Sequence, residues 1–518
     1  MTSTAVLALA LGVLVAACSS GGSAANHSSA PRASARSSSA ATPGPDGVQS
    51  SWVVAENARP GTAQWQITGD SGPEISGYAD TTAVTNGSVV HVFTSTATPS
   101  FHIEAYRMGF YQGLGARLIW RSPREAGTAQ PVCPLTPGIN MIQCHWTAPV
   151  TVPITAAWVQ GDYLLKLVAD GGRQSYVPLT IWDPSSHATY VVDNSVLTWQ
   201  AWNTYGGYDM YGGAPPGQTP QYDTRARVMS FDRPYGYGQG AGDFVGNELP
   251  LVRFVEQHGL DVTYWTDISF TQNPNLLLDH RVYLSLGHAE CWSNPQRDAA
   301  VTAAAKGVNF VFFGASPILR HVRLQSGPGD TGREMVDYRD PQADPIIRTD
   351  PAEATGNTWA VPPASLPPSL IVGDTYGGYD IDAPMVISDA GAWPFAGTGV
   401  SNGSSLPHVV RFDYDFYDPT QPGPQDVQIL AHSPVPTGQR MSPTADMTYY
   451  TDPTSRSGVI ATGTNNWIGS MSPCPGAQPA AACPAPALQQ ITGNVLRLFG
   501  GGPAGRSQPS VTNWHQFY

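Results

Sequence analysis

The chain has 518 residues, of which 41% are hydrophobic and 13% charged, and its 26 basic and 39 acidic side chains give a net charge of −13. Gly and Pro are abundant, but 14 Trp, 22 Tyr and 15 Phe supply the aromatic surface that disordered chains lack. This composition predicts two or three globular domains, and the acidic balance excludes a surface that neutralises a run of phosphates, so we expect no nucleic-acid partner.

The N-terminal residues have the pattern of a bacterial export signal. Residues 5–17 form an apolar run that is too short for a membrane-spanning helix, and small residues precede Cys18. This pattern predicts a lipoprotein signal over residues 1–18, with Cys18 lipidated, and an ordinary cleaved signal is the alternative. Residues 19–50 are rich in Ser, Ala, Gly and Pro and predict a disordered tether. We therefore expect a protein on the outer face of the bacterial plasma membrane, held by its lipid anchor alone, or a secreted one.

Five cysteines follow the tether, and export favours disulfides between them. Cys133 and Cys144 flank a Pro/Gly turn, and Cys474 and Cys483 flank a loop rich in Gly, Pro and Ala. Because each pair closes a short loop, we predict two disulfides, with zinc binding as the alternative, and an unpaired Cys291.

Residues 51–184 carry the signals of β-strands. Residues 89–94, 101–107 and 163–168 are short alternating or β-branched runs, and Gly, Pro and Asn turns separate them. No helical period of useful length interrupts these runs. We therefore predict a domain of the immunoglobulin-like β-sandwich type over this region.

The pattern changes after residue 184, where predicted strands alternate with predicted helices. The strands cover residues 189–192, 260–264, 281–286 and 308–313, and the helices cover residues 248–258 and 294–306, the second with Asn294 as its cap. Strand, helix, strand in this order predicts a mostly parallel sheet in an α/β domain over residues 185–518. The stretches over residues 205–242 and 374–403 are rich in Gly, Pro and Tyr and are expected to be loops.

A histidine and a carboxylate follow one of these strands. His288 and Glu290 stand two residues apart in the sequence GHAECW, at the carboxyl end of the predicted strand over residues 281–286. Ligands bind at this edge of open α/β sheets. Glu290 could ligate a metal or act as a base and His288 could transfer protons, whereas capping and surface roles at the helix entrance are the alternative.

Two other segments are candidates for a site. Tyr205, Tyr208 and Tyr211 lie among glycines, so their phenol oxygens could meet at one place, and a sugar-stacking platform or a packed loop are the alternatives. Arg233 could bind a carboxylate or form a surface ion pair. The sequence contains no Gly-x-Ser-x-Gly, phosphate-loop, His-Glu-x-x-His or strand-linked Gly-x-Gly-x-x-Gly signature, which disfavours common serine hydrolases, nucleotide enzymes and zinc peptidases.

Together these segments resemble the large (β) subunit of N,N-dimethylformamidase, in particular its C-terminal domain family. The resemblance covers nearly the whole chain after the tether. It rests on residues 55–62 (AENARPGT), Ile75 with 77–80 (GYAD), 106–111 (YRMGFY), 115–117 (GAR), 198–203 (TWQAWN), 230–235 (SFDRPY), 287–290 (GHAE), and 461–463 (ATG) with Trp467. It implies a β-sandwich followed by an α/β domain like that of class I glutamine amidotransferases.

The resemblance also implies a mononuclear iron, held by two tyrosines and one glutamate, that hydrolyses an amide to an amine and formate. By motif, Glu290 matches the glutamate ligand and Tyr211 matches one tyrosine ligand. The other tyrosine falls where this chain has Trp202, which cannot ligate a metal. Tyr208 or Tyr205 would have to take its place.

Three further residues match the family's catalytic positions or replace them. His288 matches the active-site histidine, which implies a proton relay. The family's catalytic asparagine after the strand over residues 308–313 is replaced by Ser316 here, which implies a hydrogen-bond donor to an oxyanion. The aromatic pair that follows in the family is replaced by Leu319 and Arg320. A later glutamate of the family corresponds to Asp413.

The predicted function is an exported, amidase-like metalloenzyme that hydrolyses the C–N bond of a small or cell-surface amide. One alternative is a binding protein on the same scaffold, which holds a glycan or a protein with its aromatic loops. Another is a carbohydrate-active enzyme that uses Glu290 and Asp413 as its carboxylate pair. The sequence leaves open the substrate, the oligomeric state and the need for a small subunit.

Overall fold

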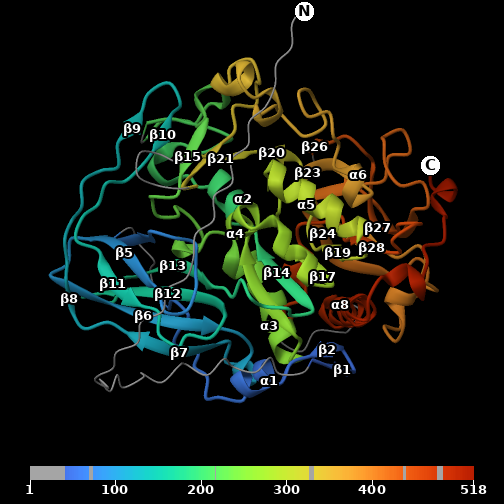
Figure 1. Cartoon of the computed structure of the whole chain (residues 1–518), viewed down its shortest axis with the longest axis horizontal. Helices are drawn as coiled ribbons and strands as arrows, with labels where there is room; N and C mark the ends of the chain where they lie inside the picture. Colours follow the sequence, from blue (N-terminus) through green and yellow to red (C-terminus); the bar gives the residue numbers. More distant parts are fainter. Residues whose placement is uncertain (1–40, 69–73, 216, 326–331, 436–438, 475–481) are drawn as a thin grey trace, which may run out of the picture. The chain divides into compact units, whose positions relative to one another are not determined.

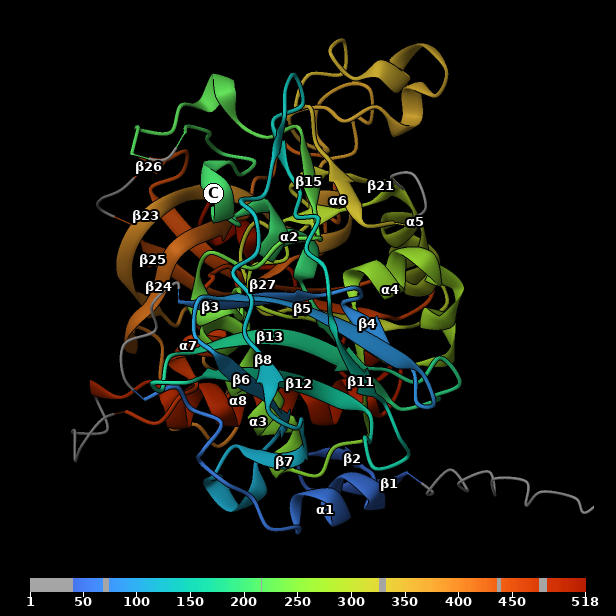
Figure 2. The ribbon, with the colours of Figure 1, turned by 90° about the vertical axis from the view of Figure 1, so that its left-hand side faces the viewer.

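Two facing sheets make up the N-terminal part of the folded chain (Figure 1). The computed structural model describes residues 41–518 apart from residues 69–73, 216, 326–331, 436–438 and 475–481. In strand order, one sheet contains β11 (Val150–Pro153), β5 (Val89–Thr96) and β3 (Ile75–Ala79), and the other contains β4 (Ala83–Val84), β13 (Gln174–Ile181), β12 (Gly161–Ala169), β6 (Ser100–Met108) and β7 (Ala116–Arg121), with β8 (Glu125–Ala126) beside β6. The two sheets lie face to face (Figure 2). Val90, Ile103, Leu165 and Val177 come from both sheets and share one core between them. The predicted strands of this region are confirmed, while the immunoglobulin-like topology stays a prediction.

The predicted tether ends earlier than residue 50. Strands β1 (Thr42–Gly44) and β2 (Gly47–Gln49) form a hairpin around the sequence Pro-Asp-Gly, and the Val48 amide donates to the Tyr190 hydroxyl at 3.0 Å. Gly47 has φ of 141°, a conformation that side chains disfavour, which explains the turn at this position. Signal residues 1–18, with Cys18, and most of the tether lie outside the described residues.

A seven-stranded sheet forms the C-terminal part, and five of its strands are parallel. Their order is β16 (Val262–Thr266), β14 (Tyr190–Asn194), β17 (Val282–Ser285), β19 (Asn309–Phe312) and β28 (Gly458–Ala461), and the antiparallel strands β27 (Thr444–Thr451) and β25 (Gln428–Pro434) follow. The prediction of a mostly parallel sheet is therefore confirmed. An amidotransferase-like layout remains a prediction.

Helices cover both faces of this sheet, because alternate strand residues point in opposite directions. Val192 and Leu284 pack in one cluster with α3 (Leu249–Gln257) and α8 (Ala485–Gly500). Val191 and Tyr283 pack in a second cluster with α4 (Asp267–Gln272) and α5 (Asn294–Ala305). Burial on both faces accounts for the continuous apolar runs in these strands. The other helices are α1 (Ser51–Asn57), α2 (Val196–Ala201), α6 (Ser369–Val372) and α7 (Trp467–Ser470).

Two local predictions were wrong. The cap of α5 is Ser293, whose hydroxyl accepts from the Gln296 amide and whose own amide donates to the Gln296 side chain, so Asn294 is the first helical residue. Residues 374–403 contain the twelve-residue strand β23 (Thr375–Val386), which pairs with β24 (Ser405–Phe416). The glycines at residues 377 and 378 made this strand look like a loop. They sit at irregularities in the pairing, where Gly377 leaves room for the Tyr414 ring.

Short strands complete the chain outside the main sheets. They are β9 (Leu135–Thr136), β10 (Met141–Ile142), β15 (Val228–Ser230), β18 (Cys291–Trp292), β20 (Arg320–His321), β21 (Arg323–Gln325), β22 (Glu334–Val336) and β26 (Gln439–Arg440). Disulfides join Cys133 to Cys144 and Cys474 to Cys483, and Cys291 is a buried free thiol, as the sequence predicts. Within the described ranges, no helix has the length and apolar character needed to cross a membrane.

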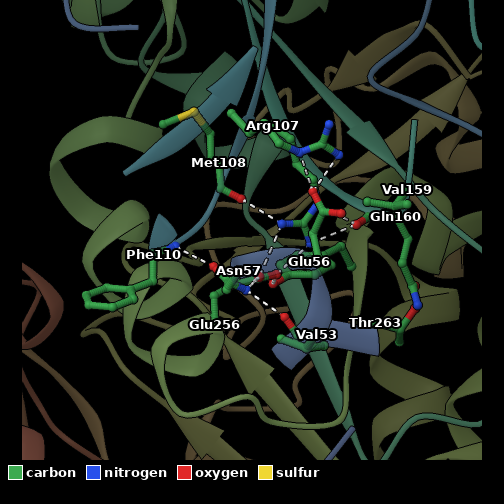
Figure 3. A network of polar contacts seen from close by, with 12 residues as sticks. Val53, Glu56, Asn57, Arg107, Met108, Phe110, Val159, Gln160, Glu256 and Thr263 are labelled. Atoms are coloured by element: carbon green, nitrogen blue, oxygen red, sulfur yellow. Dashed lines mark hydrogen bonds and ion pairs between the residues drawn. The ribbon is translucent and has the colours of Figure 1, made fainter. Parts of the chain in front are cut away.

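A buried ion pair connects the two sheet regions (Figure 3). The Arg107 side chain on β6 and the Glu256 side chain on α3 are both fully buried, with 2.7 Å between Nη2 and Oε1. Arg107 also donates to the Gln160 carbonyl, and the Asn57 amide on α1 donates to Glu256. Each charge is therefore compensated by hydrogen bonds, as a buried pair requires.

Candidate active site

The candidate site is formed at the carboxyl ends of β17 and β19. His288 and Glu290 follow β17, and Ser316 follows β19. The two turns approach closely, because a Cβ atom on Gly314 would lie 1.7 Å from the Gly287 carbonyl oxygen. Only glycine fits at residue 314. The sequence thus brings His288 and Ser316 to the same edge of the sheet.

Glu290 is a buried carboxylate at the centre of this site. Its Oε2 accepts a hydrogen bond from the Tyr211 hydroxyl and a 3.3 Å hydrogen bond from the Trp202 indole nitrogen. Its Oε1 accepts from Arg320 Nε at 3.0 Å. Burial raises the pKa of Glu290, but the Arg320 and His288 charges and the Tyr211 hydroxyl outweigh it, so the pKa falls below its usual range. Glu290 is therefore ionised at neutral pH.

Local strand pairing explains the contact between Glu290 and Arg320. Strands β18 and β20 run parallel with Cys291 opposite Arg320, and the Arg320 amide donates to the Glu290 carbonyl at 2.8 Å. The side chains of these two residues are thus held side by side. Arg320 Nη1 also donates to the Asn357 carbonyl at 2.7 Å, which fixes the far end of the guanidinium.

An aromatic stack forms the side of the site next to Glu290. The rings of Trp202 and Tyr211 stack with centroids 3.8 Å apart, and the Trp202 residue is 38% exposed. The Arg339 guanidinium lies 4.3 Å from the Tyr211 ring centroid and pairs with Asp337. Burial and the Glu290 charge raise the pKa of Tyr211 well above its usual range, so the phenol keeps its proton.

Ser316, Asp413 and His288 form a row of polar groups beside Glu290. Ser316 Oγ donates to Asp413 Oδ2 at 2.8 Å. His288 Nε2 lies 3.5 Å from the same Asp413 oxygen and 3.5 Å from Glu290 Oε2, and among the described residues this buried nitrogen has no hydrogen-bond partner. Burial raises the pKa of Asp413, and the Glu290 charge adds to this rise. Asp413 is therefore a stronger proton acceptor than an ordinary carboxylate.

One residue close to Glu290 and Asp413 was not predicted from the sequence. Tyr376 lies on β23, in the segment that was predicted to be a loop. Its pKa is raised by burial and then by the Asp413 and Glu290 charges, which places its phenol within their field. The only sequence signal was the short echo of residues 204–209 (TYGGYD) in residues 375–380, which is too weak to identify a site.

Two other predicted candidates lie elsewhere. Tyr208 is a buried part of the main core, packs against Gly213, and makes no contact with Glu290 in the described part of the chain. Arg233 is buried too, and donates to the carbonyls of Asn203, Tyr205 and Tyr208. It holds the tyrosine-rich segment in place, and because it is buried the predicted surface ion pair is wrong, while carboxylate binding stays a prediction.

The side chains around Glu290 do not fit the iron that the resemblance implies. Trp202 occupies the second tyrosine position and donates its N–H to the carboxylate, while Arg320 supplies the positive charge on the other oxygen. A cation there would meet the repulsion of two guanidinium groups, Arg320 and Arg339.

One family model matches most of the chain. The model of the family described as N,N-dimethylformamidase beta subunit-like, C-terminal, matches residues 102–481. The chain belongs to this family. The match covers the seven-stranded sheet, the part of the N-terminal sheets that follows residue 101, and every residue of the site described above. No curated protein matches the chain.

Proposed function

We propose that the protein hydrolyses the C–N bond of a linear amide without an iron ion at Glu290. The family name supports an amide substrate, since a dimethylformamidase acts on dimethylformamide. The observation that carries the proposal is the row of Ser316, Asp413 and His288, whose neighbouring members lie within 3.5 Å of each other at the carboxyl edge of the sheet.

The row has the groups that amide hydrolysis needs. Asp413 takes a proton from the attacking oxygen, because its raised pKa makes it a competent base. His288 Nε2, which no described residue hydrogen-bonds, is available to the carbonyl oxygen or the leaving nitrogen. The carboxylate of Glu290 lies 3.5 Å from His288 Nε2 and places a negative charge beside it.

We also propose an extracytoplasmic location and a substrate with a flat group. The two disulfides support export, because disulfides persist outside the cytoplasm. The partly exposed indole of Trp202 lies 5.9 Å from the His288 ring, between ring centroids, and offers a stacking surface next to the reacting groups. A small amide or the amide of a cell-surface molecule fits this arrangement.

The test is a screen for release of amine from formamides, acetamides and N-acylated sugars or peptides. We expect the wild-type protein to release amine from at least one class, and Asp413→Asn and His288→Ala to lose ~10²-fold or more in kcat/KM. The matched control is Ser369→Ala, which removes a buried hydroxyl that donates to the Pro422 carbonyl and, within the described residues, makes no hydrogen bond to the row. No amine release from any class by well-folded protein would refute the proposal.

A binding protein on the same scaffold is the second candidate, and exposed aromatic side chains favour it. Trp202, Tyr379 and Phe412 are 38%, 51% and 49% exposed, and Tyr379 and Phe412 lie close together on the β23–β24 hairpin. Such rings bind sugars by stacking. Retention on insoluble wall polysaccharide that Trp202→Ala abolishes, without hydrolysis, would favour this function over the first.

A further inference from the structure

We infer that Ser316 is a nucleophile, activated by Asp413, and that it carries the acyl group of the substrate as an ester during turnover. The inference rests on the proposed hydrolytic function and goes beyond it, because it makes the reaction covalent. It also widens the substrate class from amides to esters.

The backbone at Ser316 has the conformation of a sharp turn that presents a nucleophile. Ser316 has φ of 58°, in the left-handed region that a serine rarely adopts. It follows the parallel strand β19 by four residues, at the edge of the sheet where sites form. A serine in a strained conformation after a parallel strand is one feature of nucleophile elbows, although β20 rather than a helix follows the turn here. The sequence around Ser316, Gly-Ala-Ser-Pro-Ile, lacks the Gly-x-Ser-x-Gly signature, so the sequence did not indicate a nucleophilic role for this serine.

Hydrogen bonds from neighbouring segments hold this turn. The Ser316 amide donates to both oxygens of Asp415 at 2.9 Å, and the Ala315 amide donates to Asn465 Oδ1 at 2.7 Å. These partners are buried and come from β24 and from the segment after β28. Strain that is fixed from two sides in this way points to function, since glycine would adopt the same φ without cost.

The side chain of Ser316 meets a carboxylate that can act as its base. Its Oγ donates to Asp413 Oδ2 at 2.8 Å, and His288 lies 3.5 Å from that oxygen. A nucleophile within hydrogen-bond reach of a base is the central feature of nucleophilic catalysis. Ser316 itself is buried, while the side chains of Asp413 and His288 keep 18% and 11% of their surface exposed. A substrate therefore reaches the hydroxyl past these two groups.

The reaction balances without a metal or a co-reactant other than water. Ser316 Oγ bonds to the carbonyl carbon while its proton passes to Asp413, and the carbonyl oxygen becomes an oxyanion. The proton then moves from Asp413 to the amide nitrogen, the C–N bond breaks, and the amine leaves. Water attacks the resulting ester and gives its proton to Asp413, the bond to Oγ breaks, and Oγ recovers the proton. One amide and one water thus yield one carboxylic acid and one amine.

The test uses para-nitrophenyl acetate, an activated ester that acylates nucleophilic serines. We expect a burst of nitrophenol and, after acid quench, a mass gain of one acetyl group on the tryptic peptide that contains Ser316. Ser316→Gly should lose the adduct and ~10³-fold or more in kcat, yet fold normally because glycine accepts φ of 58°. Ser316→Cys should form the thioester, and the control Ser369→Ala should keep the adduct.

The outcomes separate this inference from the proposed function. Absence of an adduct on wild-type protein, or an adduct on another residue that persists in Ser316→Gly, would overturn the inference. If amides are hydrolysed and Ser316→Gly keeps the wild-type rate, water is the nucleophile and only the proposed function stands. If Ser316 is acylated but no amide is cleaved, the nucleophile is correct and the amide substrate is wrong.

Discussion

The guanidinium of Arg320 lies 3.0 Å from the buried carboxylate of Glu290, beside the site where the resemblance to N,N-dimethylformamidase implies a metal ion. The arginine supplies the positive charge that a buried carboxylate needs, so the site is electrostatically complete without a cation. The parallel pairing of β18 with β20 makes this contact a property of the backbone as well as of the side chains.

Arg320→Leu should therefore destabilise the protein by ~3–5 kcal/mol, because Glu290 would remain buried without its counter-charge. The measurement is the free energy of unfolding in urea. The double variant Arg320→Leu/Glu290→Gln should recover most of the loss, since both charges are then absent. Arg124→Leu breaks a mostly exposed pair with Asp170, which solvent screens, and should cost far less than Arg320→Leu. Equal losses in the Arg320 and Arg124 variants would contradict our account of Glu290.

Metal content gives the second prediction. Wild-type protein, folded in an oxidising compartment, should contain far less than one iron per chain by mass spectrometry. Trp202 stands in place of a tyrosine ligand, and the Arg320 guanidinium supplies the positive charge that the metal ion would bring. Trp202→Tyr/Arg320→Phe should gain iron, since it adds a phenol and removes the competing charge. Glu290→Ala added to this double variant should abolish the gain. About one iron per wild-type chain, lost in Glu290→Ala alone, would restore the metalloenzyme prediction.

Most strands and helices could be predicted from the sequence, whereas several long-range contacts of the site could not. The parallel strands and the helices α3 and α5 were predictable, because apolar periodicity reports burial directly. The motif match also located His288, Glu290, Ser316 and Asp413, which the structure brings together. Strand β23 was missed since pairing with β24 overrides its two glycines. The contacts of Arg320 and Tyr376 depend on long-range pairing, which no local pattern encodes.

The pH dependence of stability should follow from Asp162, a buried carboxyl between the two sheet regions. Thr180 and Asn194 donate to its Oδ1, but burial dominates and raises the pKa to about 7 from 3.8. The folded protein thus binds a proton that the unfolded chain has released, so stability is full below about pH 4 and falls as pH rises through about 7. Protonation of Asp162 alone contributes up to roughly 4 kcal/mol to the free energy of unfolding at low pH, at 1.36 kcal/mol per pKa unit.

Asp162→Asn should flatten this decline, because the amide stays neutral and keeps a hydrogen-bonding oxygen for Thr180. The measurement is the free energy of unfolding in urea between pH 4 and pH 8 for both proteins. The variant should be the more stable one at pH 8 and no more stable at pH 4. A parallel decline in the two proteins would show that Asp162 is ionised in the fold.

The pair of Arg107 and Glu256 should determine how the two sheet regions unfold together. Both side chains are fully buried, and the pair joins β6 to α3 while Glu256 also accepts from Asn57 on α1. Arg107→Met should cost ~3–5 kcal/mol, because it leaves the Glu256 charge buried and unpaired. Arg107→Met/Glu256→Leu should be less destabilised than Arg107→Met, since apolar contacts replace the ions. Calorimetry should show one transition for the wild type and two for Arg107→Met, and a single transition in both would mean that the apolar contacts alone couple the regions.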